Sequence, residues 1–332
     1  MRLATWNVAW MNALFDDDGR LREDDGPSGR HGVTRADQLA AIGIVLAVID
    51  ADAVLIVEAP DTGPRRSTVR ALERLAAVAG LRTQRCVTGF ASATEQELAV
   101  LHDPARLALA HDPQGPDRFD GTLRLDPGDG RAFRVRWARA PLELAVRPVS
   151  GRPFRLIGVH AKSLAPRGVQ DPVRAARLAF ENRRKQIAQC LWLRQRIAAH
   201  LAAGDPLIVM GDLNDGPGMT GGEPPFGRSA VEIVAGAGAA PQVRLFDPHA
   251  AAAMACPACP PATTARFWIA PEGRWLDALL DYVFVSPDLM RLRPRWRIWH
   301  PFDDPACRGN PDLRAALLAA SDHFPVTIDL DL

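Results

Sequence analysis

The sequence has little cysteine, no long apolar run and no excess of charge of one sign. Its five cysteines are odd in number and scattered over 332 residues, which argues against a disulfide framework and is typical of a reducing compartment. The longest apolar stretch, residues 40–49, is shorter than the roughly 20 residues of a membrane-spanning helix, so we expect no membrane span. Because the net charge is only +1, any surface that binds phosphate groups must be local.

The start of the sequence carries no secretion signal. No basic segment followed by an apolar one precedes the first expected strand, residues 2–8, so we expect a cytoplasmic protein. Apolar residues make up 47% of the chain and charged residues 24%, which is ordinary for a globular protein with a core. The sequence shows no linker, and an α/β sandwich of this length commonly forms one domain. We therefore expect a single domain over residues 1–332.

Apolar periodicity predicts the secondary structure. Helices are expected over residues 34–49, where Thr34 opens a capping box, and over 67–79 and 173–203. Strands are expected over residues 2–8, 53–57, 82–87, 98–102, 131–138, 142–149, 154–159, 207–210, 281–285, 295–299 and 324–330. Residues 16–32, 216–227 and 250–261 are expected to be loops. Several strands follow one another without helices, which favours antiparallel or mixed sheets.

Polar side chains stand at the ends of several expected strands. A buried strand that ends in a carboxylate, an amide or an imidazole presents that group at the rim of its sheet, so these groups could share one cleft. Carboxylate and amide oxygens suit Mg²⁺ or Mn²⁺, and imidazoles suit proton transfer and the stabilisation of oxyanions. The pattern therefore favours metal-assisted cleavage of a phosphate ester. The residues are Asn7, Glu58, His160, Asp212, Asn214, Asp281, Asp322 and His323.

The motifs that hold these residues resemble those of the endonuclease/exonuclease/phosphatase superfamily, the deoxyribonuclease I-like fold. In order they are TWNV at 5–8, LIVE at 55–58, HAKS at 160–163, GDLND at 211–215, DYV at 281–283 and SDHFPV at 321–326. The resemblance implies an α/β fold, a four-layer α/β/β/α sandwich of two mixed, mostly antiparallel sheets flanked by helices. It also implies one catalytic domain over residues 1–332 that hydrolyses phosphate esters with a divalent cation.

The resemblance also assigns roles. Asn7, Glu58 and Asp322 would hold Mg²⁺ or Mn²⁺. Asp212 would orient or deprotonate the attacking water, and Asn214 would hold the phosphate or that water. GDLND could equally form an Asx turn without any chemistry. Many relatives carry an acidic residue where this chain has Ala9, which argues against a second metal site on the first strand.

Two histidines would face the scissile phosphate. The resemblance implies that Asp281 fixes the tautomer of His323, and that an acidic residue on the preceding strand, here Glu97, orients His160. Arg139 and Lys162 would bind substrate, although a solvated strand charge explains Arg139 nearly as well.

Cysteine and tryptophan give weaker signals. Cys256 and Cys259 have the spacing of half a zinc site, but no second CxxC exists and incidental cysteines are the better interpretation. Tryptophans could stack on nucleic-acid bases, yet the strand pattern accounts for most of them as core or edge residues. These are Trp192, Trp268, Trp275, Trp296 and Trp299.

The leading functional prediction is a phosphodiesterase, most simply a nuclease that acts on nucleic acid by in-line attack of water. The alternative is a phosphatase or phosphodiesterase for a small phosphorylated metabolite or a lipid headgroup, since the same fold serves all of these. For a metabolite, the loops at residues 16–32 and 216–227 should close a narrow pocket. A binding protein that has lost catalysis is disfavoured, because the acidic and histidine positions apart from Ala9 are present.

Overall fold

The computed structural model describes residues 1–331 except 167, 170, 217–225 and 270–272. Its strands form two large sheets and two small hairpins. The first sheet contains β14 (Arg295–Ile298), β15 (Val326–Asp329), β1 (Arg2–Asn7), β2 (Ala53–Ala59), β4 (Glu97–His102) and β3 (Arg85–Thr88), in that order. The second contains β13 (Asp281–Val285), β10 (Leu207–Asp212), β9 (Phe154–His160), β8 (Leu142–Pro148) and β5 (Leu107–His111). The hairpins are β6 (Leu123–Leu125) with β7 (Phe133–Val135), and β11 (Ala265–Ile269) with β12 (Arg274–Ala278).

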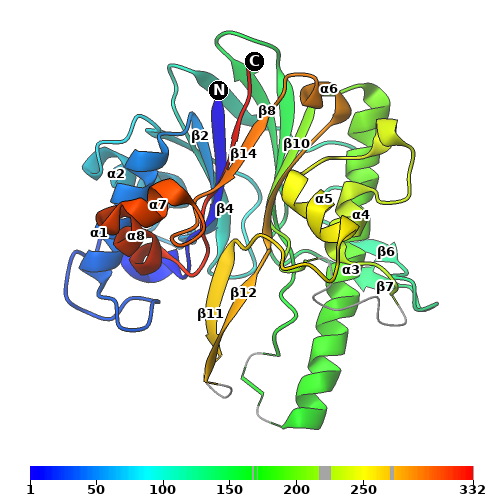
Figure 1. Cartoon of the computed structure of the whole chain (residues 1–332), viewed down its shortest axis with the longest axis horizontal. Coiled ribbons are helices and arrows are strands. Elements are labelled where there is room, and N and C mark those ends of the chain that lie inside the picture. Colours follow the sequence, from blue (N-terminus) through cyan, green and yellow to red (C-terminus); the bar gives the residue numbers. More distant parts are fainter. Residues whose placement is uncertain (167, 170, 217–225, 270–272, 332) are drawn as a thin grey trace.

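Helices cover the outer faces of the two sheets, which gives the predicted four-layer α/β/β/α arrangement (Figure 1). Helices α1 (Arg35–Ile49), α2 (Thr68–Val78) and α8 (Pro311–Ala320) pack on the first sheet, and α3 (Pro172–Ala203), α4 (Ala230–Ala235) and α5 (Pro248–Ala255) pack on the second. Each sheet is mixed, because β1–β2 and β9–β10 are parallel while the other pairs are antiparallel. Two further short helices are α6 (Pro287–Met290) and α7 (Pro305–Gly309).

The facing sides of the two sheets share a core of aliphatic side chains, including Leu55, Met210 and Val283. Gly158 lets the sheets approach, because a Cβ at this position would lie 2.7 Å from Cδ1 of Leu55. The two rims that carry the predicted polar residues are thereby held against each other.

Helix ends follow local sequence signals. The Thr34 side chain accepts from the Asp37 N–H at the start of α1, and the Asp171 carboxylate accepts from the Arg174 N–H at the start of α3. Both helices match the predicted ranges. No helix in the described part of the chain is long and apolar enough to cross a membrane.

The structure corrects two expectations. The predicted loop at 250–261 begins inside α5, whose alanine-rich turns favour a helix and whose N-terminus is capped by Asp247. Cys256 and Cys259, interpreted from the sequence as incidental cysteines outside any disulfide framework, are joined in a disulfide, because the turn between them brings their Cα atoms to 5.3 Å. The predicted loop at 16–32 contains neither helix nor strand. Of the predicted loop at 216–227, residues 217–225 lie outside the described residues.

Candidate active site

Three adjacent strands of the second sheet bring predicted residues into one row. The pairing places His160 of β9 opposite Asp212 of β10, and Asp212 opposite Asp281 of β13. Strands β9 and β10 end at this rim, whereas the antiparallel β13 begins there. Because residues directly opposite each other project from the same face of a sheet, the three side chains lie side by side.

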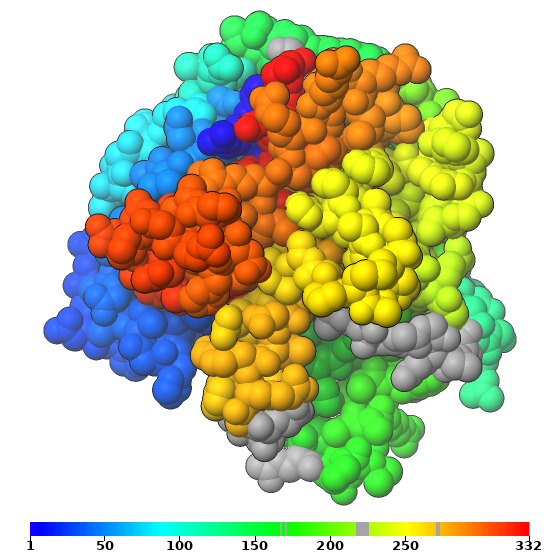
Figure 2. All heavy atoms as spheres, in the orientation of Figure 1, coloured from blue at the N-terminus to red at the C-terminus, as the bar shows by residue number. Residues whose placement is uncertain are grey.

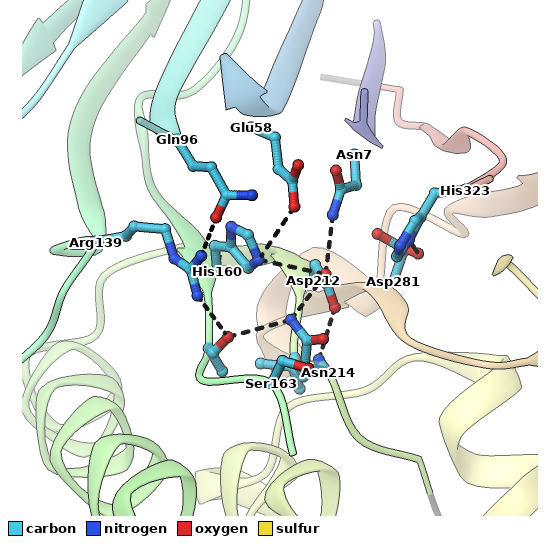
Figure 3. A network of polar contacts seen from close by, with 12 residues as sticks. Asn7, Glu58, Gln96, Arg139, His160, Ser163, Asp212, Asn214, Asp281 and His323 are labelled. Atoms are coloured by element: carbon cyan, nitrogen blue, oxygen red, sulfur yellow. Dashed lines mark hydrogen bonds and ion pairs between the residues drawn. The ribbon is translucent and has the colours of Figure 1, made fainter. Parts of the chain in front are cut away.

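The first sheet contributes Asn7 and Glu58 from its central parallel pair. Asn7 is the last residue of β1. Glu58 lies where the register between β2 and β4 shifts, and its φ of 65° is left-handed. Such a backbone costs about 1–3 kcal/mol in a non-glycine residue, and bulges of this kind re-aim side chains beside active sites. In Figure 3 the Asn7 side chain points toward Asp212 and the Glu58 carboxylate points toward His160.

These side chains line one cavity of about 600 Å³, here called the central cavity. Most of the predicted residues border it. They are Asn7, Glu58, Arg139, His160, Lys162, Asp212, Asn214 and His323. The cavity also has an apolar wall from the β11–β12 hairpin, including Phe267 and Leu276.

Asp212 is held by neighbouring amides. Its Oδ2 accepts from Asn7 Nδ2 at 3.0 Å and from Asn214 Nδ2 at 3.0 Å, and its Oδ1 accepts from the Asn214 backbone N–H at 2.6 Å. Burial, followed by the nearby charge of Asp281, raises the pKa of Asp212 to about 7, although His323 and these amides oppose the rise. The carboxylate is therefore fixed in direction and able to exchange a proton near neutral pH.

His323 is held by a charged partner. Its Nδ1 lies 2.8 Å from Asp281 Oδ2, which also accepts from the Thr264 hydroxyl at 2.9 Å. Burial alone would lower the pKa of His323, but the charge and hydrogen bond of Asp281 raise it to about 10. His323 is consequently a cation at neutral pH, suited to contact an anionic oxygen.

His160 lies between two carboxylates. Its Nε2 is 3.6 Å from Asp212 Oδ2 and 4.0 Å from Glu58 Oε1. Glu97, the predicted partner of His160, is engaged elsewhere, since its carboxylate accepts from the Ser92 backbone N–H at 3.0 and 3.1 Å.

Gln96, the residue before Glu97, borders the central cavity instead. Gln96 accepts from Arg139, which also donates to the Ala161 carbonyl at 3.3 Å (Figure 3). Gln96 is not among the residues predicted from the sequence, although the alternation of side chains about Glu97 is a signal that could have found it.

Asp322 lies apart from the other predicted metal ligands. Its carboxylate is 3.4 Å from Arg30, and it borders a second cavity beside the first, here called the outer hollow. The outer hollow is lined by Arg30, His31, Arg266, Phe267, Trp268, Trp275 and Asp322.

The donor atoms around the central cavity fit a divalent cation. Asn7 Oδ1 and Asp281 Oδ1 are buried and have no hydrogen-bond partner among the described residues, and buried polar atoms are normally satisfied. Asp212, Asp281 and His323 each offer a ligand atom within 4.8 Å of the others, but a cationic His323 has no lone pair for a metal, so Asn7 and the Glu58 carboxylate are the better ligands. Hard oxygens in this number suit Mg²⁺ or Mn²⁺.

Comparison with known proteins gives a consistent result. The sequence model of the Endonuclease/Exonuclease/phosphatase family matches residues 4–323. None of the curated proteins matches the chain significantly. Among solved structures, the 3′ phosphatase NExo from Neisseria, bound to a product DNA hairpin, is 15% identical with a TM-score of 0.50 over 100% of both chains. A humanised D. rerio TDP2 is 13% identical with a TM-score of 0.50, over 99% of this chain and 98% of that one. At these identities the structural likeness shows the fold alone.

Proposed function

This chain belongs to the endonuclease/exonuclease/phosphatase family of phosphoester-hydrolysing enzymes, and we propose that it is a divalent-metal-dependent phosphodiesterase acting on nucleic acid. The observation that carries the proposal is the convergence of strand-end residues from both sheets on the central cavity. A solved protein of the same fold, NExo, holds a product DNA hairpin, which supports nucleic acid as the substrate class. We also propose that residues 1–332 act as one catalytic domain, because both sheets contribute to the site.

Asp212 is the base in this mechanism. The two amides that donate to its carboxylate fix its direction, and a pKa of about 7 lets it accept a proton from water at neutral pH. Water aligned by Asp212 attacks the phosphorus atom opposite the leaving oxygen. Asn214 keeps this carboxylate in place and presents its own amide beside the attacking water.

His323 and His160 stabilise the phosphoryl oxygens. The cationic His323, held by Asp281, donates to an oxygen that gains charge in the transition state. His160 faces the same cavity from the neighbouring strand, and Arg139 and Lys162 border the space where the substrate phosphate lies.

A divalent cation would be held by Glu58 and Asn7, whereas Asp322, the third ligand predicted from the family resemblance, is paired with Arg30 at the outer hollow. When bound, the ion supplies Lewis-acid stabilisation of the phosphoryl oxygens and of the leaving group. Asn7 Oδ1 has no hydrogen-bond partner within the described part of the chain, which supports Asn7 as a ligand.

The test is hydrolysis of bis-p-nitrophenyl phosphate, p-nitrophenyl phosphate and an oligonucleotide, in Mg²⁺, Mn²⁺ or EDTA. We expect metal-dependent cleavage of the diester and the oligonucleotide, reduced about 10²- to 10⁴-fold by Asp212→Asn and by His323→Ala. Asp303→Asn, which changes a carboxylate with a side chain 74% exposed, is the matched control and should retain activity.

The same assay separates the alternatives. Cleavage of the monoester alone would replace the proposal with a phosphatase of small phosphorylated substrates. Diester cleavage that persists in EDTA would contradict the metal dependence.

A further inference from the structure

The β11–β12 hairpin has two faces with different surroundings. Its register pairs Phe267 with Leu276, and Trp268 with Trp275. Phe267 and Leu276 face the central cavity. Because side chains alternate along a strand, the tryptophans lie on the opposite face, where they are 53% and 49% exposed. Two large aromatic side chains are thus left in solvent beside the site.

The tryptophans form one wall of the outer hollow, a space of about 730 Å³. Their rings meet edge to face with centroids 5.3 Å apart. The guanidinium of Arg266 lies 4.9 Å from the Trp275 ring and 5.1 Å from the Phe302 ring, so it is held between two aromatic groups. Cross-strand pairing of this kind stabilises a hairpin, but it does not require the rings to border a cavity.

Arginines complete the outer hollow. Arg30 enters from the 16–32 loop, and its Nε is buried without a hydrogen-bond partner among the described residues. Asp322 lies 3.4 Å from Arg30, and Asp277 lies 3.8 Å from Arg266. The carboxylates neutralise part of the charge and leave aromatic faces next to guanidinium donors, which is the combination that binds a base together with its phosphate.

The outer hollow lies beside the central cavity, and Phe267 forms part of the wall of each. The Phe267 ring lies 5.4 Å from that of His323. The Arg266 backbone N–H donates to the Asp322 carbonyl at 2.7 Å, next to His323 in the chain. Figure 2 shows the hairpin as an exposed surface near the blue N-terminal segment. A strand of nucleic acid whose phosphate lies at His323 could therefore continue into the outer hollow.

We propose that the outer hollow binds an unpaired nucleotide next to the scissile phosphate, with its base stacked on Trp268 and Trp275 and its phosphate near Arg30 and Arg266. This inference rests on the proposed function and specifies its substrate as nucleic acid with an unpaired nucleotide at that position. Stacking on aromatic rings tolerates any base, so the preference concerns strandedness rather than sequence. A base inside a blunt duplex is already paired and stacked, and it binds this surface poorly.

The test measures binding and catalysis separately. Fluorescence anisotropy of a labelled single strand of about ten nucleotides, within the range of known single-strand sites, reports binding in EDTA. Hydrolysis of bis-p-nitrophenyl phosphate, which has no neighbouring nucleotide, reports catalysis. The variants are Trp268→Ala with Trp275→Ala, and Phe246→Ala as an aromatic control that is 38% exposed and pairs with Val285, at the end of β13 away from Asp281.

The double tryptophan variant should bind the single strand about 10-fold or more weakly and hydrolyse the small diester within about twofold of wild type. Phe246→Ala should match wild type in both assays, and wild type should prefer the single strand to a blunt duplex. The inference would be overturned if the double variant bound the single strand as tightly as wild type. It would also be overturned if hydrolysis of the small diester fell by the same factor as affinity for the single strand.

The two proposals can fail separately. If the wild-type protein binds the single strand, and the tryptophan substitutions weaken that binding, but no diester is cleaved, the nucleotide-binding inference stands and the proposed function is contradicted. If the wild-type protein cleaves diesters but the tryptophan substitutions leave binding unchanged, the proposed function stands and the nucleotide-binding inference is contradicted.

Discussion

At the scale of single residues, Glu58 combines a left-handed backbone with a carboxylate that faces the central cavity. We expect Glu58→Gln to keep the fold, because the side chains have the same shape, and to weaken binding of Mn²⁺ since it removes the negative charge. Catalysis should fall about 10²-fold or more. Titration of Mn²⁺ followed by electron paramagnetic resonance measures the affinity.

Glu181→Gln changes a carboxylate whose side chain is 54% exposed on α3 and should leave that affinity unchanged. Equal affinity of the Glu58 variant and the wild type would exclude Glu58 as a ligand.

Asp281 and His323 should act as one unit. Asp281→Asn removes the charge that holds His323 protonated, so the diester rate should fall about 10²-fold or more. Because the two groups work together, adding Asp281→Asn to His323→Ala should cost little further activity. Comparison of kcat for the two single variants and the double variant tests this, and additive losses would show that Asp281 acts independently of His323.

The sequence indicates which residues end a strand better than it indicates where their side chains point. The positions of Asp212 and His160 at the rim of the second sheet could be predicted from the ends of their strands alone. Gln96 and Glu97 differ by one position, and only the pairing of β4 decides which of them reaches the cavity. The direction of Asp322 depends on Arg30, which is distant in the sequence but lies 3.4 Å away in space.

At the scale of elements, long periodic segments could be predicted and short ones could not. Helix α3 has a capping residue, Asp171, at its start and Gly204 at its end. The β11–β12 hairpin has no comparable capping signal at its ends. Its two tryptophans also resemble residues of buried strands, so the sequence does not indicate that they are exposed. Trp192 and Trp299 are indeed buried, whereas Trp268 and Trp275 are not. Exposure of an aromatic residue depends on what packs against it, which the local sequence does not contain.

Strand β10 depends on a glycine just before Asp212, the proposed base. Gly211 has a φ of 135°, and a Cβ there would lie 2.0 Å from the Val159 carbonyl oxygen. Gly211→Ala should therefore lower the free energy of unfolding by about 3 kcal/mol and displace Asp212, which reduces kcat as well. Urea denaturation measures the first effect.

Gly63→Ala is the control, because the added Cβ meets nothing within 4 Å. It should change stability by less than about 0.5 kcal/mol. Equal stability of the two variants would contradict the predicted clash.

At the scale of the whole molecule, a cluster of charges holds the rim of the first sheet opposite the active site. Asp52 accepts from the Arg2 backbone N–H at 2.7 Å and from Arg82 at 2.7 Å, and Arg82 also donates to Asp103 at 3.0 Å. The cluster thus ties β1 to the segments that precede β3 and follow β4. Burial alone would raise the pKa of Asp52, but the Arg2 N–H and Arg82 together hold it below its usual range.

A carboxylate with a lowered pKa in the folded state stabilises the protein above its unfolded pKa of about 3.9, and the effect is lost as pH falls through the folded value. Asp52→Asn should therefore reduce the free energy of unfolding by about 2 kcal/mol at neutral pH. At acid pH, below the lowered folded-state pKa of Asp52, the variant and wild type should converge. Urea denaturation at both pH values tests this, with Asp17→Asn, whose side chain is 76% exposed, as the control. A gap that stays constant down to acid pH would refute the linkage.

The four-layer architecture could be predicted because each motif marks a strand end and their order matches one family. The junction between the sheets could not be predicted in the same way. Position 158 must be glycine because Leu55 of the opposite sheet would clash with a Cβ there. The local sequence around Gly158 does not indicate that contact.

The pairing of β15 between β1 and β14 has a consequence for synthesis of the protein. The first sheet joins a strand that leaves the ribosome early to strands that leave it late, and His323 precedes the last of them. Asn7, Glu58 and Asp212 are therefore made long before the histidine that completes their cavity. A growing chain would hold no finished site, so the hydrolase could gain activity only after the segment that carries His323 has been made and has paired with β1.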